Sequence, residues 1–236
     1  MEESMRKVLV MMGDGINSEN ELALAFSRLG AEVRKIHVNE LMKSPKILLN
    51  YQILAIPGGF SFGDEIRSGK ILAEKMREIL SDVLLKFKKN DGRIIGICNG
   101  FQVLAQLGAF NEGERSFTLL ENSHGQFMDK WVKMRVSEGN TSPWFKNLSG
   151  SIYLPVRHKE GRVISKNQDA FHPALIYETD VNGSFEKIAG ITDKTGNILG
   201  LMPHPEVACF SFLHPFNQGA EENAQKINKI FFNGLS

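Results

Sequence analysis

The spacing of apolar and polar residues predicts a chain in which buried strands alternate with amphipathic helices. Mostly apolar runs at residues 7–12, 51–56 and 93–97 are typical of strands covered on both faces, and residues 31–38 are expected to form a further strand. Apolar residues recur at helical spacing between 71 and 87, between 101 and 107, and along the segment 219–232. Alternating strands and helices predict an α/β fold with a central, mostly parallel sheet flanked by helices.

The first helix is expected to begin at Ser18, because Ser18 and Glu21 have the spacing of a capping box, and to end at Gly30. Beyond Phe110 the pattern changes to short strand-like runs separated by Gly, Asn, Asp and Pro. These runs cover residues 116–120, 131–136, 152–155, 162–165, 174–177 and 188–192. A last central strand is expected at 197–202. Since no linker intervenes, we expect antiparallel hairpins appended to the parallel sheet within a single domain, 1–236.

Cys98 stands between the strand 93–97 and the following helix, with Gly96 and Gly100 on either side. Strand, one corner residue and helix is the layout of a nucleophile elbow, in which small neighbours allow a tight turn and close helix packing. A thiol at the start of a helix lies near unpaired N–H groups and the positive end of the helix dipole, which favours the thiolate. The alternative is a small apolar residue buried at a strand end.

The last central strand ends in a Pro-His-Pro-Glu sequence that contains His204 and Glu206. The two prolines hold the backbone extended or turned, and alternation along an extended chain would send both side chains to the same side. Glu206 could then orient His204 and stabilise its charged form, leaving the other ring nitrogen for a nucleophile. A polar turn or a metal ligand are the alternatives. The histidines and cysteines do not show the clustered spacing of a metal site, so no metal is expected.

A glycine pair, Gly58-Gly59, follows the strand 51–56. Glycines at a strand end let a backbone N–H approach a developing oxyanion, and the N–H of Asn99 is the natural second donor. A glycine-rich turn without a function is the alternative. Nucleophile, base, orienting carboxylate and oxyanion donors would all lie at strand ends of one sheet.

Composition excludes several classes of protein. The formal net charge is +1 with charges interspersed, so no nucleic-acid partner is expected. No apolar run approaches the roughly 20 residues of a membrane helix, and the polar start does not suit a secretory signal. The two cysteines, Cys98 and Cys209, are therefore expected as free thiols in the cytoplasm.

Gly13-Asp14-Gly15 lacks the third glycine of a dinucleotide fingerprint. Gly63 to Lys70 is one residue too long for a Walker A loop, with Ile71 in place of Ser or Thr.

Taken together, the sequence around Cys98 (Gly-Ile-Cys-Asn-Gly-Phe-Gln) and around His204 (Pro-His-Pro-Glu) resembles the class I, or triad, glutamine amidotransferase family. Within it, Pro-Gly-Gly-Phe-Ser-Phe-Gly-Asp at 57–64, Asn182-Gly183-Ser184 and the segment 188–191 resemble the glutaminase subunits of phosphoribosylformylglycinamidine synthases. The similarity covers nearly the whole chain. It implies a flavodoxin-like class I amidotransferase fold and a role in purine biosynthesis.

By this resemblance, Cys98 would be the nucleophile, His204 the general acid/base and Glu206 its partner. Gly59 and Asn99 would supply the oxyanion N–H groups, and Gln102 and Phe60 would contact the substrate L-glutamine. Asp64 and Arg67 fit the family loop too, and a solvated surface pair is the alternative for them. Two departures from the family pattern stand out: Gln126 where Arg is expected, and Val181 where Pro is expected.

The resemblance also implies partners. Ammonia released from glutamine would pass to a separate synthetase subunit, which would use ATP and Mg²⁺ to convert formylglycinamide ribonucleotide to formylglycinamidine ribonucleotide. A small accessory subunit is expected in the complex, and no cofactor is expected in this chain. The rival interpretations are another class I amidotransferase, a cysteine hydrolase or peptidase on the same type of sheet, and a non-catalytic scaffold that retains the fold.

Overall fold

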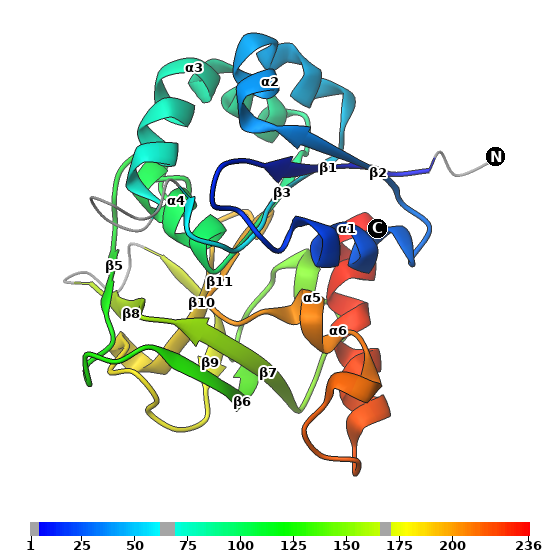
Figure 1. The fold of residues 1–236 in the computed structure, drawn as a ribbon, viewed down its shortest axis with the longest axis vertical. Coiled ribbons are helices and arrows are strands. Elements are labelled where there is room, and N and C mark those ends of the chain that lie inside the picture. Colours follow the sequence, from blue (N-terminus) through cyan, green and yellow to red (C-terminus); the bar gives the residue numbers. More distant parts are fainter. Residues whose placement is uncertain (1–4, 62–68, 166–170) are drawn as a thin grey trace.

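The structure is a computed structural model that describes residues 5–61, 69–165 and 171–236. Over these residues the fold is built on a nine-stranded sheet in the order β2-β1-β3-β4-β11-β10-β9-β6-β7, and β5 pairs with β8 in a separate ribbon (Figure 1). The strands are β1 Lys7–Met12, β2 Glu32–His37, β3 Ile53–Ile56, β4 Arg93–Ile97, β5 Thr118–Glu121, β6 Met128–Val136, β7 Ser151–His158, β8 Glu160–Ile164, β9 His172–Tyr177, β10 Ile188–Thr192 and β11 Ile198–Leu201.

The helices lie in two groups. α1, α5 and α6 contact one another on one face of the sheet, and α2, α3 and α4 lie on the other (Figure 1). Their bounds are α1 Glu19–Ser27, α2 Val38–Lys43, α3 Lys70–Lys89, α4 Asn99–Leu107, α5 Pro205–Ala208 and α6 Ala220–Leu235. The sequence pattern did not predict the short helices α2 and α5.

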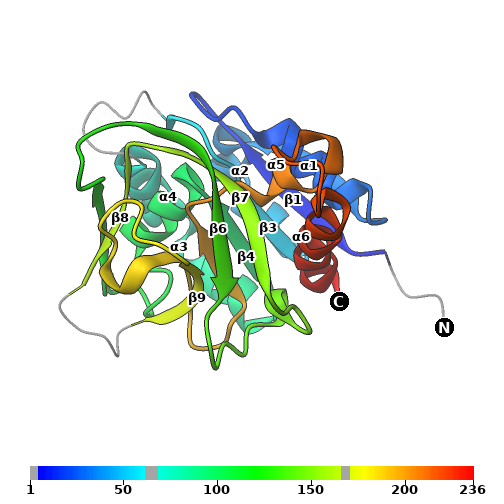
Figure 2. The same cartoon turned by 90° about the horizontal axis from the view of Figure 1, so that it is seen from below.

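The sheet has a parallel half and an antiparallel half. β2, β1, β3, β4 and β11 run parallel to one another. The inner residues of β1, β3, β4 and β11 are almost fully buried, whereas β2, at the edge of the sheet, buries only Ile36. β10, β9, β6 and β7 continue the same sheet with antiparallel pairing (Figure 2). The predicted α/β class, with antiparallel strands appended to a parallel sheet, is confirmed. The expected hairpins differ in one respect, because β5 and β8 leave the main sheet and pair with each other.

β7 bends back across the end of β11, and this contact brings the two halves of the sheet together. Val156 forms an isolated bridge with Pro203, and the N–H of His204 donates to the carbonyl of Pro155 at 2.9 Å. The corner between β7 and β8 therefore lies over the carboxyl ends of β4 and β11, where ligands collect in open α/β sheets.

The predicted capping box of α1 is absent. Ser18 is the N-cap residue, and its carbonyl accepts the first helical hydrogen bond from Leu22 N–H at 3.1 Å, but its hydroxyl caps nothing. Such a side-chain cap typically stabilises a helix by about 1 kcal/mol. The hydroxyl of Ser18 instead accepts a hydrogen bond from the N–H of Gly58 at 2.9 Å, 40 residues away in the chain. A long-range contact has replaced the local one.

Candidate active site

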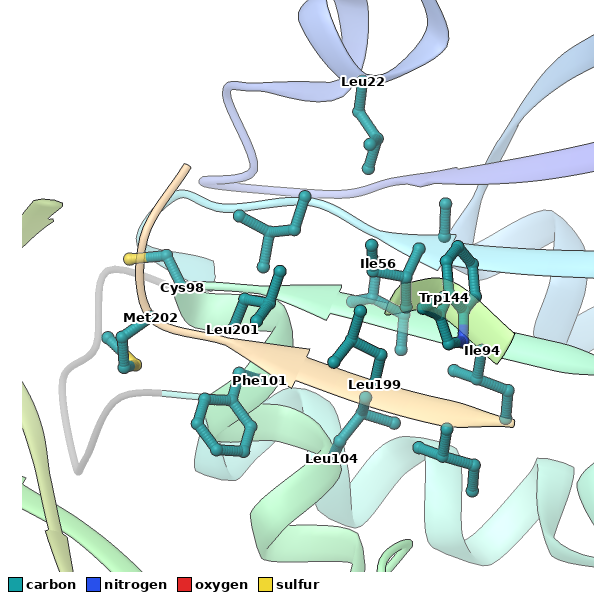
Figure 3. Packing of buried hydrophobic residues seen from close by; sticks show 14 of the residues in the cluster. Leu22, Ile56, Ile94, Cys98, Phe101, Leu104, Trp144, Leu199, Leu201 and Met202 are labelled. Carbon is teal, nitrogen blue, oxygen red and sulfur yellow. The ribbon is translucent and has the colours of Figure 1, made fainter. Parts of the chain in front are cut away.

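Cys98 occupies the predicted elbow. β4 ends at Ile97 and α4 begins at Asn99, so Cys98 alone makes the corner, with φ 51° and ψ −106°. Positive φ is strained for a non-glycine residue and persists where the surrounding structure holds it. The N–H of Cys98 donates to the Leu201 carbonyl at 2.7 Å, which ties the corner to β11. Figure 3 shows Cys98 at the end of β4, beside Leu201 and Met202.

The two glycines around the corner are required by close packing, as the sequence pattern predicts. A Cβ atom at position 100 would lie 2.0 Å from the Ile56 carbonyl oxygen, and one at position 96 would lie 2.7 Å from the carbonyl carbon of Gly100. Any side chain at either position would push α4 away from β3 and β4. Gly108 ends α4 in the left-handed conformation at φ 70°, which also agrees with the prediction.

His204 and Glu206 form a buried pair. The distance between His204 Nδ1 and Glu206 Oε1 is 2.7 Å, and the Glu206 side chain is fully buried. The predicted pairing is confirmed, but the predicted route to it is wrong. The chain does not continue extended through Pro205; it begins the helix α5 there, and Glu206 reaches back to His204 from the first helical turn. Proline is well suited to a first helical position because its N–H is not needed there.

The environment of His204 favours its protonated form. Burial lowers the pKa of the imidazole, but the Glu206 carboxylate and the Cys98 sulfur act in the opposite direction, and the net effect raises the pKa well above its usual range. Because Nδ1 is engaged by Glu206, Nε2 is the nitrogen left for the thiol. An imidazolium beside a thiol stabilises the thiolate.

Gly58 lies between the two predicted catalytic side chains. A Cβ atom at position 58 would lie 2.8 Å from His204 Cε1 and 3.4 Å from Cys98 Cβ. The glycine after β3, the elbow after β4 and the histidine after β11 therefore meet at one edge of the sheet. The Sγ atom of Cys98 also lies 3.6 Å from the Arg157 carbonyl oxygen, on the corner between β7 and β8.

The other predicted site residues lie around this centre. The Asn99 side chain connects the elbow to its surroundings: its Oδ1 accepts from Ser61 N–H at 3.3 Å, and its Nδ2 donates to Gln102 Oε1 at 2.9 Å. Gln102 Nε2 donates to the Glu160 carbonyl at 2.6 Å. Gln102 thus braces the β7–β8 corner against α4, and its contact with glutamine stays a prediction. So does that of Phe60, whose ring is half exposed. Asp64 and Arg67 lie outside the described residues.

The two residues that depart from the family pattern, Gln126 and Val181, lie outside the group of residues around Cys98. Gln126 is exposed, and its carbonyl accepts a hydrogen bond from Asn122 Nδ2 at 3.0 Å. Asn122 Nδ2 also lies 3.0 Å from the His158 carbonyl, so this turn supports the outer side of the β7–β8 corner. Val181 is half-buried against the core. The hydrogen bonds that the structure describes for Gln126 use its main chain, which any residue other than proline provides.

Sequence reasoning missed His158. Its ring is buried against Gly161, neither ring nitrogen has a hydrogen-bond partner among the described residues, and burial, followed by the charges of His204 and His124, lowers its pKa to about 3. His158 is therefore neutral beside a protonated His204. The only signal for it in the sequence is its position at the end of β7, beyond the predicted strand 152–155.

Cys209 is a free, buried thiol, as is Cys98, so the prediction of two free cysteines is confirmed. Its Sγ donates to the Glu206 carbonyl at 3.0 Å, and burial raises its pKa to about 11. Among the described residues, no group of three or more His, Cys, Asp or Glu side chains could hold a metal ion. No helix in the same part of the chain is long and apolar enough to cross a membrane.

Cys209→Ser is expected to leave the reaction that the family resemblance implies, release of glutamate from glutamine, within about twofold of the wild-type rate. The thiol is protonated and donates to a main-chain carbonyl of α5, and a serine hydroxyl can donate to the same carbonyl. The measurement is steady-state glutamate release by the purified variant. A complete loss of glutamate release would mean that the reactive thiol has been assigned to the wrong cysteine.

Comparison with known proteins places this geometry in a family. The profile of the CobB/CobQ-like glutamine amidotransferase domain matches residues 5–236. The chain belongs to this glutamine amidotransferase family. It is 38% identical to a protein of Methanococcus maripaludis named phosphoribosylformylglycinamidine synthase subunit PurQ, over 95% of this chain and 90% of the relative. A PurQ subunit of Dehalococcoides mccartyi is 34% identical over 97% and 96% of the two chains.

Solved structures agree. The amidotransferase matches a chain from the structure of PurLQS from Thermotoga maritima with a TM-score of 0.78 and 31% identity, over 98% of both chains. A glutamine amidotransferase from the same organism has a TM-score of 0.65 at 15% identity, covering 99% of this chain and 97% of the other, which shows the fold alone. The predicted amidotransferase fold is confirmed.

Proposed function

We propose that this amidotransferase is the glutaminase subunit of a cytoplasmic phosphoribosylformylglycinamidine synthase, which hydrolyses L-glutamine to glutamate and ammonia in purine biosynthesis. The observation that carries the proposal is the buried His204–Glu206 pair meeting a strained Cys98 elbow at one edge of the sheet. The PurQ subunits that resemble the chain over nearly its full length support a place in the same synthase. A rigid arrangement of nucleophile, base and orienting carboxylate is what amide hydrolysis through a thioester needs.

In the first step, the Cys98 thiolate attacks the carboxamide carbon of glutamine, and the carbonyl oxygen becomes an oxyanion. The N–H groups of Gly59 and Asn99 hold this oxyanion. As the carbon–nitrogen bond breaks, the imidazolium of His204 gives its proton to the leaving nitrogen, and ammonia departs. A thioester between Cys98 and the glutamyl group remains.

In the second step, His204 is neutral and takes a proton from a water molecule, which attacks the thioester carbon. The carbon–sulfur bond breaks, glutamate is released, and the Cys98 thiolate and the His204 imidazolium are restored. Glu206 orients the ring through Nδ1 and stabilises the positive charge that His204 carries in each cycle. The Glu206 carboxylate contacts the His204 ring and not the reacting atoms, so Glu206 is a positioning residue.

Ammonia passes to a synthetase subunit that uses ATP and Mg²⁺, and a small accessory subunit completes the complex. The PurLQS structure of the Thermotoga maritima relative supports an assembly of this kind. A free-standing triad would hydrolyse glutamine and lose the ammonia to water. We therefore expect a low rate in the isolated chain and a higher one in the complex.

The test is glutamate production by the isolated chain and then with the synthetase, ATP, Mg²⁺ and formylglycinamide ribonucleotide added. We expect glutamine-specific turnover that rises about tenfold or more in the complete mixture. A synthetase that improves the alignment of one oxyanion donor would suffice for this rise, because a single such donor is worth about 10²–10³ in rate. Turnover of peptide or ester substrates in place of glutamine would favour a cysteine hydrolase. An absence of turnover with every substrate, in all mixtures, would favour a non-catalytic scaffold.

A further inference from the structure

Gly58, in the loop after β3, is held at both ends by two consecutive residues of the loop between β1 and α1. Its N–H donates to Ser18 Oγ at 2.9 Å, and its carbonyl accepts from Asn17 N–H at 3.2 Å. Both contacts are long-range in sequence and lie beside the active site, since a Cβ atom at position 58 would be 3.2 Å from Ser18 Oγ and 2.8 Å from His204 Cε1. We call Asn17 and Ser18 the Gly58 clamp.

The clamp sets the direction of the next N–H group. The peptide between Gly58 and Gly59 is planar and trans, so its N–H points opposite to its carbonyl. Because the carbonyl of Gly58 is directed to Asn17, the Gly59 N–H is directed away from the β1–α1 loop. The hydrogen bonds among the described residues leave this N–H unused: Gly59 pairs with Ile16 in an isolated bridge, whose bonds come from the N–H groups of Asn17 and Phe60.

Close packing gives the two loops little freedom to slide. A Cβ atom at Gly15 would lie 2.0 Å from the Phe60 carbonyl oxygen, and one at Gly59 would lie 2.4 Å from the Gly15 carbonyl oxygen. Gly59 has φ 142° and Gly15 has φ 81°, which L side chains rarely adopt. Within this contact Ser18 gives Gly58 a side-chain hydrogen bond, and it does so with a hydroxyl that leaves its own helix uncapped.

We propose that Ser18 is a positioning residue for the oxyanion hole: its hydroxyl holds the Gly58 N–H, and thereby keeps the Gly59 N–H in line with the oxyanion. This rests on the proposed glutaminase function and adds a residue of the β1–α1 loop to the machinery. Ser18 acts only through Gly58 and does not touch the substrate. Loss of the hydroxyl leaves the nucleophile and the base in place and weakens the stabilisation of negative charge on the substrate oxygen.

The test compares two reagents for Cys98 in the full chain. A glutamine analogue with a chloromethyl ketone in place of the carboxamide reacts through an oxyanion, whereas iodoacetamide reacts by direct displacement at its CH₂ carbon. In Ser18→Ala we expect inactivation by the ketone to slow about tenfold or more, with the iodoacetamide rate changed less than twofold. Glutamine turnover should fall in kcat with little change in KM, since a donor that acts on the oxyanion is worth up to about 10²–10³ in rate.

Two further Ser18 variants and one control variant keep the result interpretable. Ser18→Thr retains a hydroxyl and should restore at least part of the ketone rate. Ser18→Gly removes the hydroxyl with a residue that is well tolerated at a helix N-cap, so it replaces Ser18→Ala if that variant folds poorly. Ser27→Ala is the matched control, because Ser27 is an exposed hydroxyl on the same helix, bonded to the Leu24 carbonyl.

Equal slowing with both reagents in the hydroxyl-free variants would show that Ser18 supports the fold of the site as a whole, and would overturn the proposal. Unchanged rates with both would overturn it as well. The proposed function fails in a different way, visible in the wild-type chain: no glutamate is formed and the ketone does not react at Cys98.

Discussion

The Cys98→Ala variant is expected to lose all measurable glutamine-dependent synthesis while the complex still makes product from added ammonia. Cys98 supplies the attacking sulfur, and the second cysteine cannot replace it, because Cys209 is a protonated thiol bonded to the Glu206 carbonyl. The alanine side chain is smaller than the thiol and leaves the corner backbone as it is, so subunit assembly should be retained. Formylglycinamidine ribonucleotide is measured with glutamine and then with an ammonium salt as the nitrogen source.

The ammonia arm of that experiment separates chemistry from structure. If Cys98→Ala lost the ammonia-dependent reaction too, the cysteine would be needed for folding or assembly, in line with its positive φ and its burial at the strand end. Thermal unfolding of the isolated variant gives a second check. A midpoint within a few degrees of the wild type is expected, because a side chain of this size at a strand end usually changes the free energy of unfolding by only about 1–2 kcal/mol.

Local sequence signals were sufficient for the parallel half of the sheet and for the elbow. β1 and β4 have the predicted bounds, and α4 follows the corner at Cys98 and ends at Gly108. These features depend on contacts between residues close in sequence, or on apolar runs that can be buried only as central strands of a sheet. The glycines at 96 and 100 belong to the same class, since they are needed wherever a helix packs closely on the strand before it.

Long-range contacts could not be read in this way. Ser18 and Glu21 have the spacing of a capping box, yet the hydroxyl bonds Gly58, and nothing near Ser18 in the sequence indicates that partner. His158 became part of the site's surroundings because β7 bends back over β11, which depends on the course of the antiparallel half of the sheet. The pairing of His204 with Glu206 was predicted for the wrong reason, since the helix α5 makes it.

The His204→Ala variant is expected to lower glutamate production by at least 10²-fold, because proton transfer by a positioned base supplies about 10²–10⁴ in rate. Glu206→Gln should cost less, as Cys98 and His204 both remain and the amide fills the same buried space. It should also change the pH dependence. The Glu206 carboxylate is the foremost of the groups that raise the pKa of His204, so removing its charge lowers that pKa.

The sign of the shift follows from which form of His204 starts the reaction. The imidazolium donates the proton to the leaving ammonia, so the rate falls on the alkaline side as His204 loses its proton. With a lower pKa, the alkaline limb of the kcat/KM profile in Glu206→Gln lies at lower pH than in the wild type. A matched control is Glu178→Gln. Glu178 directly follows β9, and the contacts that the structure describes for its carboxylate are with Lys133 and Ser151, not with the triad. An unmoved alkaline limb in Glu206→Gln, or an equal shift in Glu178→Gln, would show that Glu206 does not set the charge state of His204.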